Sequence, residues 1–300
     1  MSSEQMHDDE ALIDGALVRR LIDSQFPIWT ALPLTRVRPA GTDNALYRLG
    51  SDLVVRLPRT QDVTVQAAKE QLWLPRLAPM LPLPIPVPVA VGLPGEGYPW
   101  PWAVYRWLTG EPAAAGVLGH PHRTARVLGE FVVALQHVDP GDGPSPGEHN
   151  FYRGGPLGDR DRHVREAIRA LSGSIETTAV TSAWEAALDA AVWEGPPAWI
   201  HGDLHAGNLL VDRGVVTAVL DFGGLAVADP ACDLMVAWTF LPAGARAAFR
   251  ATVLCDDASW VRGRGWALSM ALIAIPYYLA RNPPFAAEAR RWLDEVLADR

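Results

Sequence analysis

The segment at residues 199–223 constrains this chain more than any other part of its sequence. It reads Trp-Ile-His-Gly-Asp-Leu-His-Ala-Gly-Asn-Leu-Leu-Val-Asp-Arg-Gly-Val-Val-Thr-Ala-Val-Leu-Asp-Phe-Gly. Residues 208–212 and 215–220 are apolar runs on either side of an Arg-Gly pair, which is the pattern of a β-hairpin. Such a hairpin returns Asp221 to the end at which Asn208 begins, because neighbouring strands lie about 5 Å apart.

Three polar side chains gather at this end of the predicted hairpin. Asn208 and Asp221 offer the amide and carboxylate oxygens that suit Mg²⁺, an ion that keeps room for phosphates and water. Asp203 lies in the loop that enters the same end, where it could orient a hydroxyl and accept its proton. In-line phosphoryl transfer requires this combination of positioning, metal and base. We therefore expect Asp203 to be the catalytic base and Asn208 and Asp221 to be the magnesium ligands.

The spacing of these residues is also specific. The pattern His-x-Asp-Leu-x-x-x-Asn followed by Asp-Phe-Gly matches the signature that protein kinases use for this chemistry. A core hairpin with incidental polar residues is the alternative. It would leave three polar groups uncompensated at the end of an apolar hairpin, which is costly.

Residues 201–208, His-Gly-Asp-Leu-His-Ala-Gly-Asn, resemble the aminoglycoside phosphotransferases and their relatives rather than the protein kinases. Residues 221–223 and 228–234 are similar to the same family's downstream sequence, and a looser resemblance covers most of the chain. The resemblance implies an α+β, bilobal protein-kinase-like fold, with Mg²⁺ and ATP or GTP in the cleft between the lobes. It also implies that His201 and His205 order the loop around Asp203.

The first predicted lobe, residues 1–107, is a small and mostly antiparallel β-sheet with one helix inside a connection. Its predicted strands are 34–39, 45–49, 53–57, 88–92 and 102–107. One helix is predicted before the sheet, at 8–24, and another at 62–78, where Pro75 should end or bend it early.

The second predicted lobe, residues 108–300, is larger and mainly helical. Its predicted helices are 123–137, 159–171, 178–193, 232–240, 243–253, 258–280 and 285–298. Residues 139–158 form a long loop rich in glycine and proline, and loops of this length tend to be functional or disordered. Asp229 and Asp233 stand near helix starts, where carboxylates often cap, so we expect both to be structural.

A kinase-like small lobe needs a cation on its third strand, paired with a carboxylate on the following helix. Arg56 stands where lysine is usual, and Glu70 is its candidate partner. The alternatives are an ordinary strand cation and a solvated carboxylate. Arginine binds phosphate well but is not interchangeable with lysine, so this departure puts the geometry of nucleotide binding in question.

Two further segments are expected to contact the nucleotide. Residues 41–44 offer backbone N–H groups and the short side chains of Thr42 and Asn44 to a phosphate, although a plain hairpin turn fits them nearly as well. Residues 105–108 should form the hinge that meets the base through its backbone. The hinge residues assigned to nucleotide binding are Arg106, Trp107 and Leu108.

The acceptor is expected to be a small molecule. Residues 110–300 carry 16 Lys and Arg against 23 Asp and Glu, which favours a cationic sugar such as an aminoglycoside. Aromatic residues would equally suit a macrolide. Candidate contacts are Glu148, His149, Asn150, Tyr152, Arg153, Trp260, Trp266, Tyr277, Tyr278 and Glu288. The alternatives are a macrolide or metabolite kinase of the same fold, and a nucleotide-binding pseudokinase, which the intact set around Asp203 opposes.

Composition argues against other classes of protein. The net charge of −8 opposes a nucleic-acid partner, which needs a basic face. The longest apolar stretch, residues 266–280, contains Pro276 and is too short to span a bilayer, so we expect a buried helix and no membrane partner. Two cysteines make no disulfide framework, and no signal peptide is evident. These features predict a cytoplasmic protein and leave its oligomeric state open.

Overall fold

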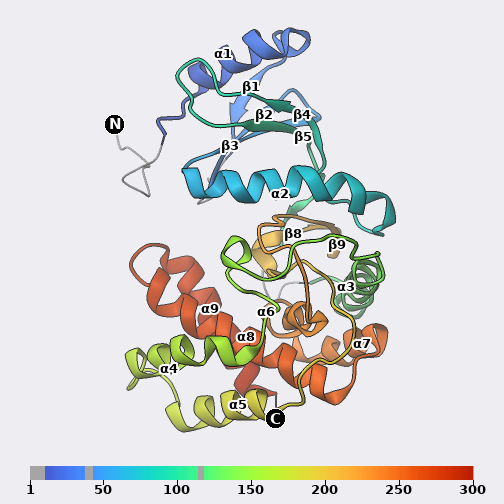
Figure 1. Ribbon diagram of the computed structural model, residues 1–300, viewed down its shortest axis with the longest axis vertical. Coiled ribbons are helices and arrows are strands. Elements are labelled where there is room, and N and C mark those ends of the chain that lie inside the picture. Colours follow the sequence, from blue (N-terminus) through green and yellow to red (C-terminus); the bar gives the residue numbers. More distant parts are fainter. Residues whose placement is uncertain (1–10, 38–42, 114–117, 300) are drawn as a thin grey trace. The chain divides into compact units, whose positions relative to one another are not determined.

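The computed structural model describes residues 11–37, 43–113 and 118–299. The chain forms two compact units: residues 1–79 with 84–109, and residues 80–83 with 110–300. The division predicted from the sequence falls after residue 107. Figure 1 shows a sheet with two long helices in the first unit and a mainly helical second unit.

The first unit is built on an antiparallel sheet with the strand order β1-β2-β3-β5-β4. Its strands are β1 (Leu34–Arg36), β2 (Asn44–Leu49), β3 (Leu53–Pro58), β4 (Pro88–Gly92) and β5 (Trp102–Arg106). All the predicted strands of this lobe are present. The strand predicted at 34–39 ends at Arg36, and residues 38–39 lie outside the described residues.

The helices α1 (Gly15–Gln25) and α2 (Gln61–Leu77) lie on opposite faces of this sheet (Figure 1). Successive side chains of a strand point to opposite faces, so Val55 and Leu57 join the core under α1 while Arg56 points toward α2. The other members of this core are Leu17, Val18, Leu21, Ile22, Ala45, Tyr47, Leu49, Tyr98, Trp102 and Val104.

Both helices differ from their predicted spans. The described residues before Gly15 are not helical, because Asp14 caps α1 by accepting the N–H of Leu17 at 2.7 Å. Pro75 does not end α2, which continues to Leu77. A proline in the last turn removes one helical hydrogen bond, and the buried apolar side of α2 offsets that loss.

The second unit contains the remaining helices and strands of the described residues. The helices are α3 (Pro121–Gln136), α4 (Asp161–Ala170), α5 (Thr177–Asp189), α6 (Val236–Thr239), α7 (Ala243–Val253), α8 (Asp257–Tyr278) and α9 (Pro283–Ala298). The strands are β6 (Glu111–Pro112), β7 (Ala198–Ile200), β8 (Leu209–Asp212), β9 (Val215–Val219) and β10 (Ala226–Ala228), paired as β6-β8-β9 and β7-β10. Short 3₁₀ helices in the chain are Pro27–Trp29, Ala78–Met80, Glu148–Asn150, Leu157–Arg160, Ala206–Asn208 and Pro230–Met235.

The predicted hairpin is the pair β8–β9, and every predicted helix of this lobe has a counterpart. The helix predicted at 178–193 is too long, since α5 ends at Asp189 ahead of a Gly-Pro-Pro sequence. Strands β6, β7 and β10 were not expected, because two or three residues are too few to show an alternating pattern. No helix in the described part of the chain is long and apolar enough to cross a membrane.

Packing between α3 and α7 depends on Gly129, where a Cβ would come within 2.7 Å of Thr252. We predict that Gly129→Ala destabilises the protein by about 1–3 kcal/mol, although alanine favours helix by about 1 kcal/mol. The matched control is Gly244→Ala in α7, where a Cβ meets nothing within 4 Å. Urea unfolding measures both variants, and a Gly129→Ala protein as stable as the wild type would contradict the packing described here.

Candidate active site

The backbone of the hairpin brings Asn208 and Asp221 to one end. Beyond the last pair of β8 and β9, the N–H of Leu220 donates to the carbonyl of Asn208 at 2.8 Å. Asp221 follows directly, with an exposed side chain and a left-handed backbone at φ 56°. Its Oδ1 accepts the N–H of Gly223 at 3.2 Å. Left-handed backbone is strained for a residue with a side chain and is found at functional sites.

Asp203 is held at both of its carboxylate oxygens. Oδ1 forms an ion pair with Nη1 of Arg153 at 2.8 Å, and Oδ2 accepts a hydrogen bond from Nδ2 of Asn208 at 3.2 Å. The side chain is 20% exposed, so it remains open to a substrate. Burial raises the pKa of Asp203, but the Arg153 guanidinium together with His205 and His201 outweighs burial and holds the pKa below its usual value.

The side-chain amide of Asn208 has a defined orientation. Its Nδ2 donates to the backbone carbonyl of Asp203 at 2.9 Å as well as to the carboxylate, and both groups are acceptors. No hydrogen bond in the described residues uses Oδ1, which is therefore the oxygen left for a ligand. Amide and carboxylate oxygens are the hard donors that Mg²⁺ prefers, so this oxygen and the Asp221 carboxylate suit the ion by their chemistry.

His201 is fully buried and orders the turn around Asp203. Its Nε2 lies 2.9 Å from the carbonyl of Leu220, and its Nδ1 accepts the N–H of Asp203 at 3.1 Å. These contacts require a neutral ring with the proton on Nε2. Burial lowers the pKa of His201 to about 4, and the ring packs 4.5 Å from that of Phe222.

His205 orders the other end of the same loop. Its Nδ1 accepts the N–H of Gly207 at 3.1 Å, and its Nε2 lies 3.8 Å from Oδ2 of Asp203. The ring also packs against Phe285 and Trp292 of α9, at centroid distances of 5.6 and 5.3 Å. His205 thus connects the loop to the C-terminal helix.

Asp233 anchors the 201–208 loop through its backbone. Its carboxylate is fully buried and accepts the backbone N–H groups of His201 and Gly202, each at 2.7 Å. Gly202 has φ 78°, and a Cβ there would lie 2.5 Å from the carbonyl of Gly224. Asp229, by contrast, caps its own 3₁₀ helix and pairs with Arg262 at 2.8 Å. Sequence reasoning marked both acids as structural but did not find the contact between Asp233 and the loop.

A second segment, residues 147–155, brings Arg153 to Asp203. Asn150 is fully buried within it and donates from Nδ2 to the carbonyls of Arg153 at 2.9 Å and Gly224 at 3.3 Å. Its Oδ1 accepts the N–H of Gly147 at 2.9 Å. The sequence placed Asn150 and Arg153 among the candidate acceptor contacts and gave no sign that Arg153 pairs with Asp203.

The candidate nucleotide residues lie in the first unit. Arg56 and Glu70 form an ion pair in which Glu70 is fully buried and the Arg56 side chain is 13% exposed. Oδ1 of Asn44 is buried with no hydrogen-bond partner in the described residues, and such an atom suits a ligand. Thr42 lies outside the described residues.

The hinge candidates differ in what they leave for a ligand. Arg106 is exposed, and Trp107 and Leu108 are half-buried. The N–H of Trp107 donates to the carbonyl of Asp52 at 2.7 Å, and its ring lies under the guanidinium of Arg48 at 4.2 Å. A base that meets residue 107 would therefore use its carbonyl rather than its N–H.

The aromatic acceptor candidates fall into two groups. Trp266 is fully buried, and Trp260 packs on Trp238 at 4.7 Å, so both serve the core. Tyr278 instead contacts Phe285 at 4.7 Å, and Phe285 contacts His205. The second group thus extends from the 201–208 loop toward exposed Tyr277.

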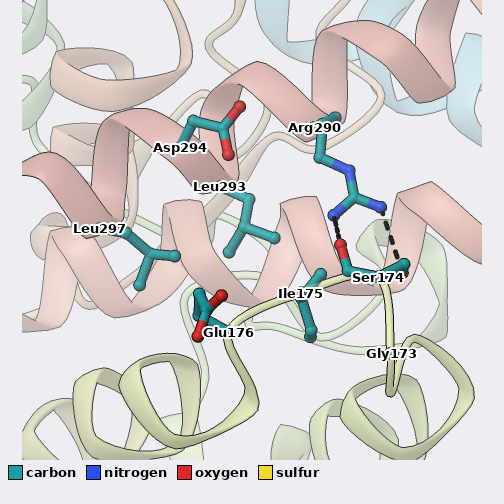
Figure 2. Close-up of a pocket in the computed structure, with 8 residues that line it drawn as sticks. All are labelled: Gly173, Ser174, Ile175, Glu176, Arg290, Leu293, Asp294 and Leu297. Atoms are coloured by element: carbon teal, nitrogen blue, oxygen red, sulfur yellow. Dashed lines mark hydrogen bonds between the residues drawn. The ribbon is translucent and has the colours of Figure 1, made fainter.

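A pocket of about 310 Å³ lies elsewhere in the second unit, between the turn after α4 and helix α9 (Figure 2). Arg290 closes one side by donating to the carbonyl and hydroxyl of Ser174 at 2.9 and 3.4 Å. Glu176 and Asp294 line the other side. None of the residues expected at the active site lines this pocket.

The first unit has an antiparallel sheet with an Arg–Glu ion pair, and the second is a helical unit whose loop presents Asp203 and whose hairpin presents Asn208 and Asp221. Together these features define a protein-kinase-like α+β protein. Solved structures share this fold. Aminoglycoside 2'-phosphotransferase-IIIa in its GDP complex has a TM-score of 0.73 at 19% identity, over 96% of this chain and 99% of that one. Macrolide 2'-phosphotransferase MphH from Brachybacterium faecium has a TM-score of 0.61 at 23% identity, over 92% and 98%.

Sequence comparison extends this result. An 80-residue stretch is 40% identical to the uncharacterized protein YcbJ of Bacillus subtilis (strain 168), covering 26% of this chain and 24% of that protein. The chain thus matches about a quarter of the length of that curated relative. Residues 35–267 match the phosphotransferase enzyme family, and the chain belongs to this family. The resemblance and the kinase-like fold expected from the sequence are therefore confirmed.

The buried position of His201 leads to a pH-dependent prediction. Its folded pKa of about 4 lies below the ordinary value of 6.5, so the unfolded chain binds a proton in this range before the folded chain does. The contribution of this group to stability is complete above pH 6.5 and falls by about 3 kcal/mol as the pH drops to 4. Nitrogen-15 NMR of the histidine rings should show His201 titrating near pH 4, whereas a midpoint near 6.5 would show that the ring is not enclosed as described.

Proposed function

We propose that this protein transfers the γ-phosphate of ATP or GTP to a hydroxyl of a small, antibiotic-like molecule. The observation that carries the proposal is the arrangement at Asp203, whose carboxylate is fixed by Asn208 and Arg153 and yet remains open to a substrate. Membership of the phosphotransferase enzyme family supports the reaction class.

Asp203 is the proposed catalytic base. It aligns the acceptor hydroxyl and takes its proton as the hydroxyl oxygen bonds to the γ-phosphorus, while the bond from that phosphorus to the β–γ bridging oxygen breaks. Mg²⁺ would shield the charge of the phosphates when bound, and Asn208 and Asp221 are the residues that would hold it. His201, His205 and Asp233 keep the loop in place and do not meet the substrate.

Arg56 is proposed to bind the α- and β-phosphates, with Glu70 holding it in position. Arginine does this with a planar fork instead of the point charge of a lysine, so nucleotide oxygens must be arranged to fit it. Asn44, with its unpartnered buried oxygen, and the carbonyl of Trp107 are further proposed contacts for the nucleotide.

An aminoglycoside is the proposed acceptor, because the second unit is acidic and such sugars are cationic. Relatives of the same fold include a phosphotransferase solved with GDP and kanamycin, and another solved with gentamicin. A macrolide is the second candidate, supported by the aromatic residues Tyr278 and Phe285 beside His205. The free cysteines Cys232 and Cys255 agree with a reducing compartment, and we propose a cytoplasmic site of action.

The deciding experiment measures Mg²⁺-dependent nucleotide turnover against aminoglycosides and macrolides. We predict that Asp203→Ala lowers kcat by roughly 10²–10⁴-fold for the substrate that the wild type accepts, because the general base is lost. The matched control is Asp212→Ala, which removes an exposed carboxylate from the far end of the same hairpin. Turnover that survives Asp203→Ala would refute the assigned base, and nucleotide binding without turnover in the wild type would favour a pseudokinase.

The Arg56–Glu70 pair allows a separate test of nucleotide binding. Removing Arg56 alone would take its guanidinium away from the buried Glu70 carboxylate, so the pair is replaced together as Arg56→Met with Glu70→Met. We predict a roughly tenfold or larger rise in the nucleotide KM, with stability changed by less than about 2 kcal/mol. Arg56→Lys, which keeps the charge and loses the fork, should bind the nucleotide with an affinity between those of the wild type and the double variant. An unchanged nucleotide KM in the double variant would show that the pair serves only the packing of α2 on the sheet.

A further inference from the structure

Arg153 meets the Asp203 carboxylate from a segment that is built to hold it there. Asn150 fixes the backbone of Arg153 from a fully buried position. Arg160 donates hydrogen bonds to the carbonyl of Phe151 at 3.2 Å and to the hydroxyl of Ser269 at 2.6 Å. Its guanidinium lies 5.2 Å from the centre of the Trp266 ring. Two anchors from different elements thus flank Arg153, so its position does not depend on the ion pair with Asp203 alone.

The guanidinium of Arg153 is only partly used. Asp203 is its ion-pair partner through Nη1, and no other hydrogen bond or ion pair of this group occurs among the described residues. Its side chain is 14% exposed, and none of its nitrogen atoms is buried without a partner. A guanidinium has five N–H donors in one plane, so donors remain for a second anion beside the first.

We propose that Arg153 is a catalytic residue that binds the γ-phosphoryl group during its transfer, which rests on the phosphotransferase function proposed above. The acceptor oxygen lies about 2.7 Å from its base and approaches the phosphorus to about 3 Å. The oxygens of the phosphoryl group therefore come within about 5 Å of the Asp203 carboxylate. An arginine in contact with that carboxylate can reach them.

Charge gives the reason for a cation at this place. An ionised base and a phosphoryl group repel each other when they are brought this close, and the repulsion is strong in a partly buried site. The guanidinium between them cancels much of it, and a fork of two N–H groups matches the geometry of phosphate oxygens. In a loose transition state the charge spreads over the equatorial oxygens of the transferring group, where these donors lie.

The step itself is balanced without any further reactant. The acceptor hydroxyl gives its proton to Asp203 and its oxygen bonds to the γ-phosphorus. The bond between that phosphorus and the bridging oxygen breaks, and the electron pair leaves with the nucleoside diphosphate. Arg153 transfers no proton and forms no covalent bond, because it stays protonated throughout.

Binding measurements test this role independently of the acceptor. Calorimetry with Mg²⁺ compares the nucleoside diphosphate with its β,γ-imido triphosphate analogue on the wild type, Arg153→Gln and Arg153→Lys. We predict that Arg153→Gln weakens binding of the triphosphate analogue roughly tenfold and leaves binding of the diphosphate unchanged. The affinity of Arg153→Lys for the analogue should lie between those of the wild type and Arg153→Gln. Arg165→Gln, on the exposed side of α4, is the control and should change neither.

Turnover provides the second readout where the wild type phosphorylates an acceptor. Arg153→Gln should then lower kcat by roughly 10³-fold with little change in the acceptor KM. The proposal would be overturned if Arg153→Gln lowered the affinity for both nucleotides equally or lowered neither. It would also be overturned by an effect confined to the acceptor KM, which would make Arg153 an acceptor contact. A wild type that phosphorylates nothing would refute the proposed function, and the binding comparison would still decide the role of Arg153. If Arg153→Gln fails to fold, Arg153→Lys decides the role of Arg153. The measurement is again the loss of affinity for the triphosphate analogue relative to that for the diphosphate.

Discussion

The carboxylate of Asp233 is the contact on which the site depends. It receives two backbone N–H groups of the 201–208 loop and is fully buried, so it holds the start of the loop against the rest of the second unit. Burial raises the pKa of Asp233 to about 7, and the two donated hydrogen bonds oppose that rise by favouring the ionised form. The direction of the Asp203 side chain and the hydrogen bond of His201 to the carbonyl of Leu220 both follow from the position that Asp233 fixes.

Arginine supplies the cations at both candidate sites. The chain has 26 basic residues, and Lys69 is its only lysine. Arg56 pairs with Glu70 in the first unit, and Arg153 pairs with Asp203 in the second. Each pair leaves a planar guanidinium beside a place where phosphate oxygens are proposed to bind, and this geometry favours forked contacts over the point charge that lysine offers.

The sequence predicts those parts of the site whose partners are close along the chain. Asn208 and Asp221 are joined by one tight hairpin, so strand spacing alone brings them together. The contacts of Asp233 with His201 and of Arg153 with Asp203 span 32 and 50 residues and depend on tertiary packing, which no local pattern encodes. The same limit explains the missed strands β7 and β10, which are short and are paired with each other in the described part of the chain.

One loop and one hairpin are proposed to bring a base and two metal ligands to a single centre. A crystal structure with Mn²⁺ and a β,γ-imido nucleotide tests it most directly, because the anomalous signal locates the metal. We predict Mn²⁺ on Oδ1 of Asn208 and the carboxylate of Asp221, with Asp203 free of metal and still paired with Arg153. Metal bound by Asp203 itself, or bound away from Asn208 and Asp221, would contradict the account.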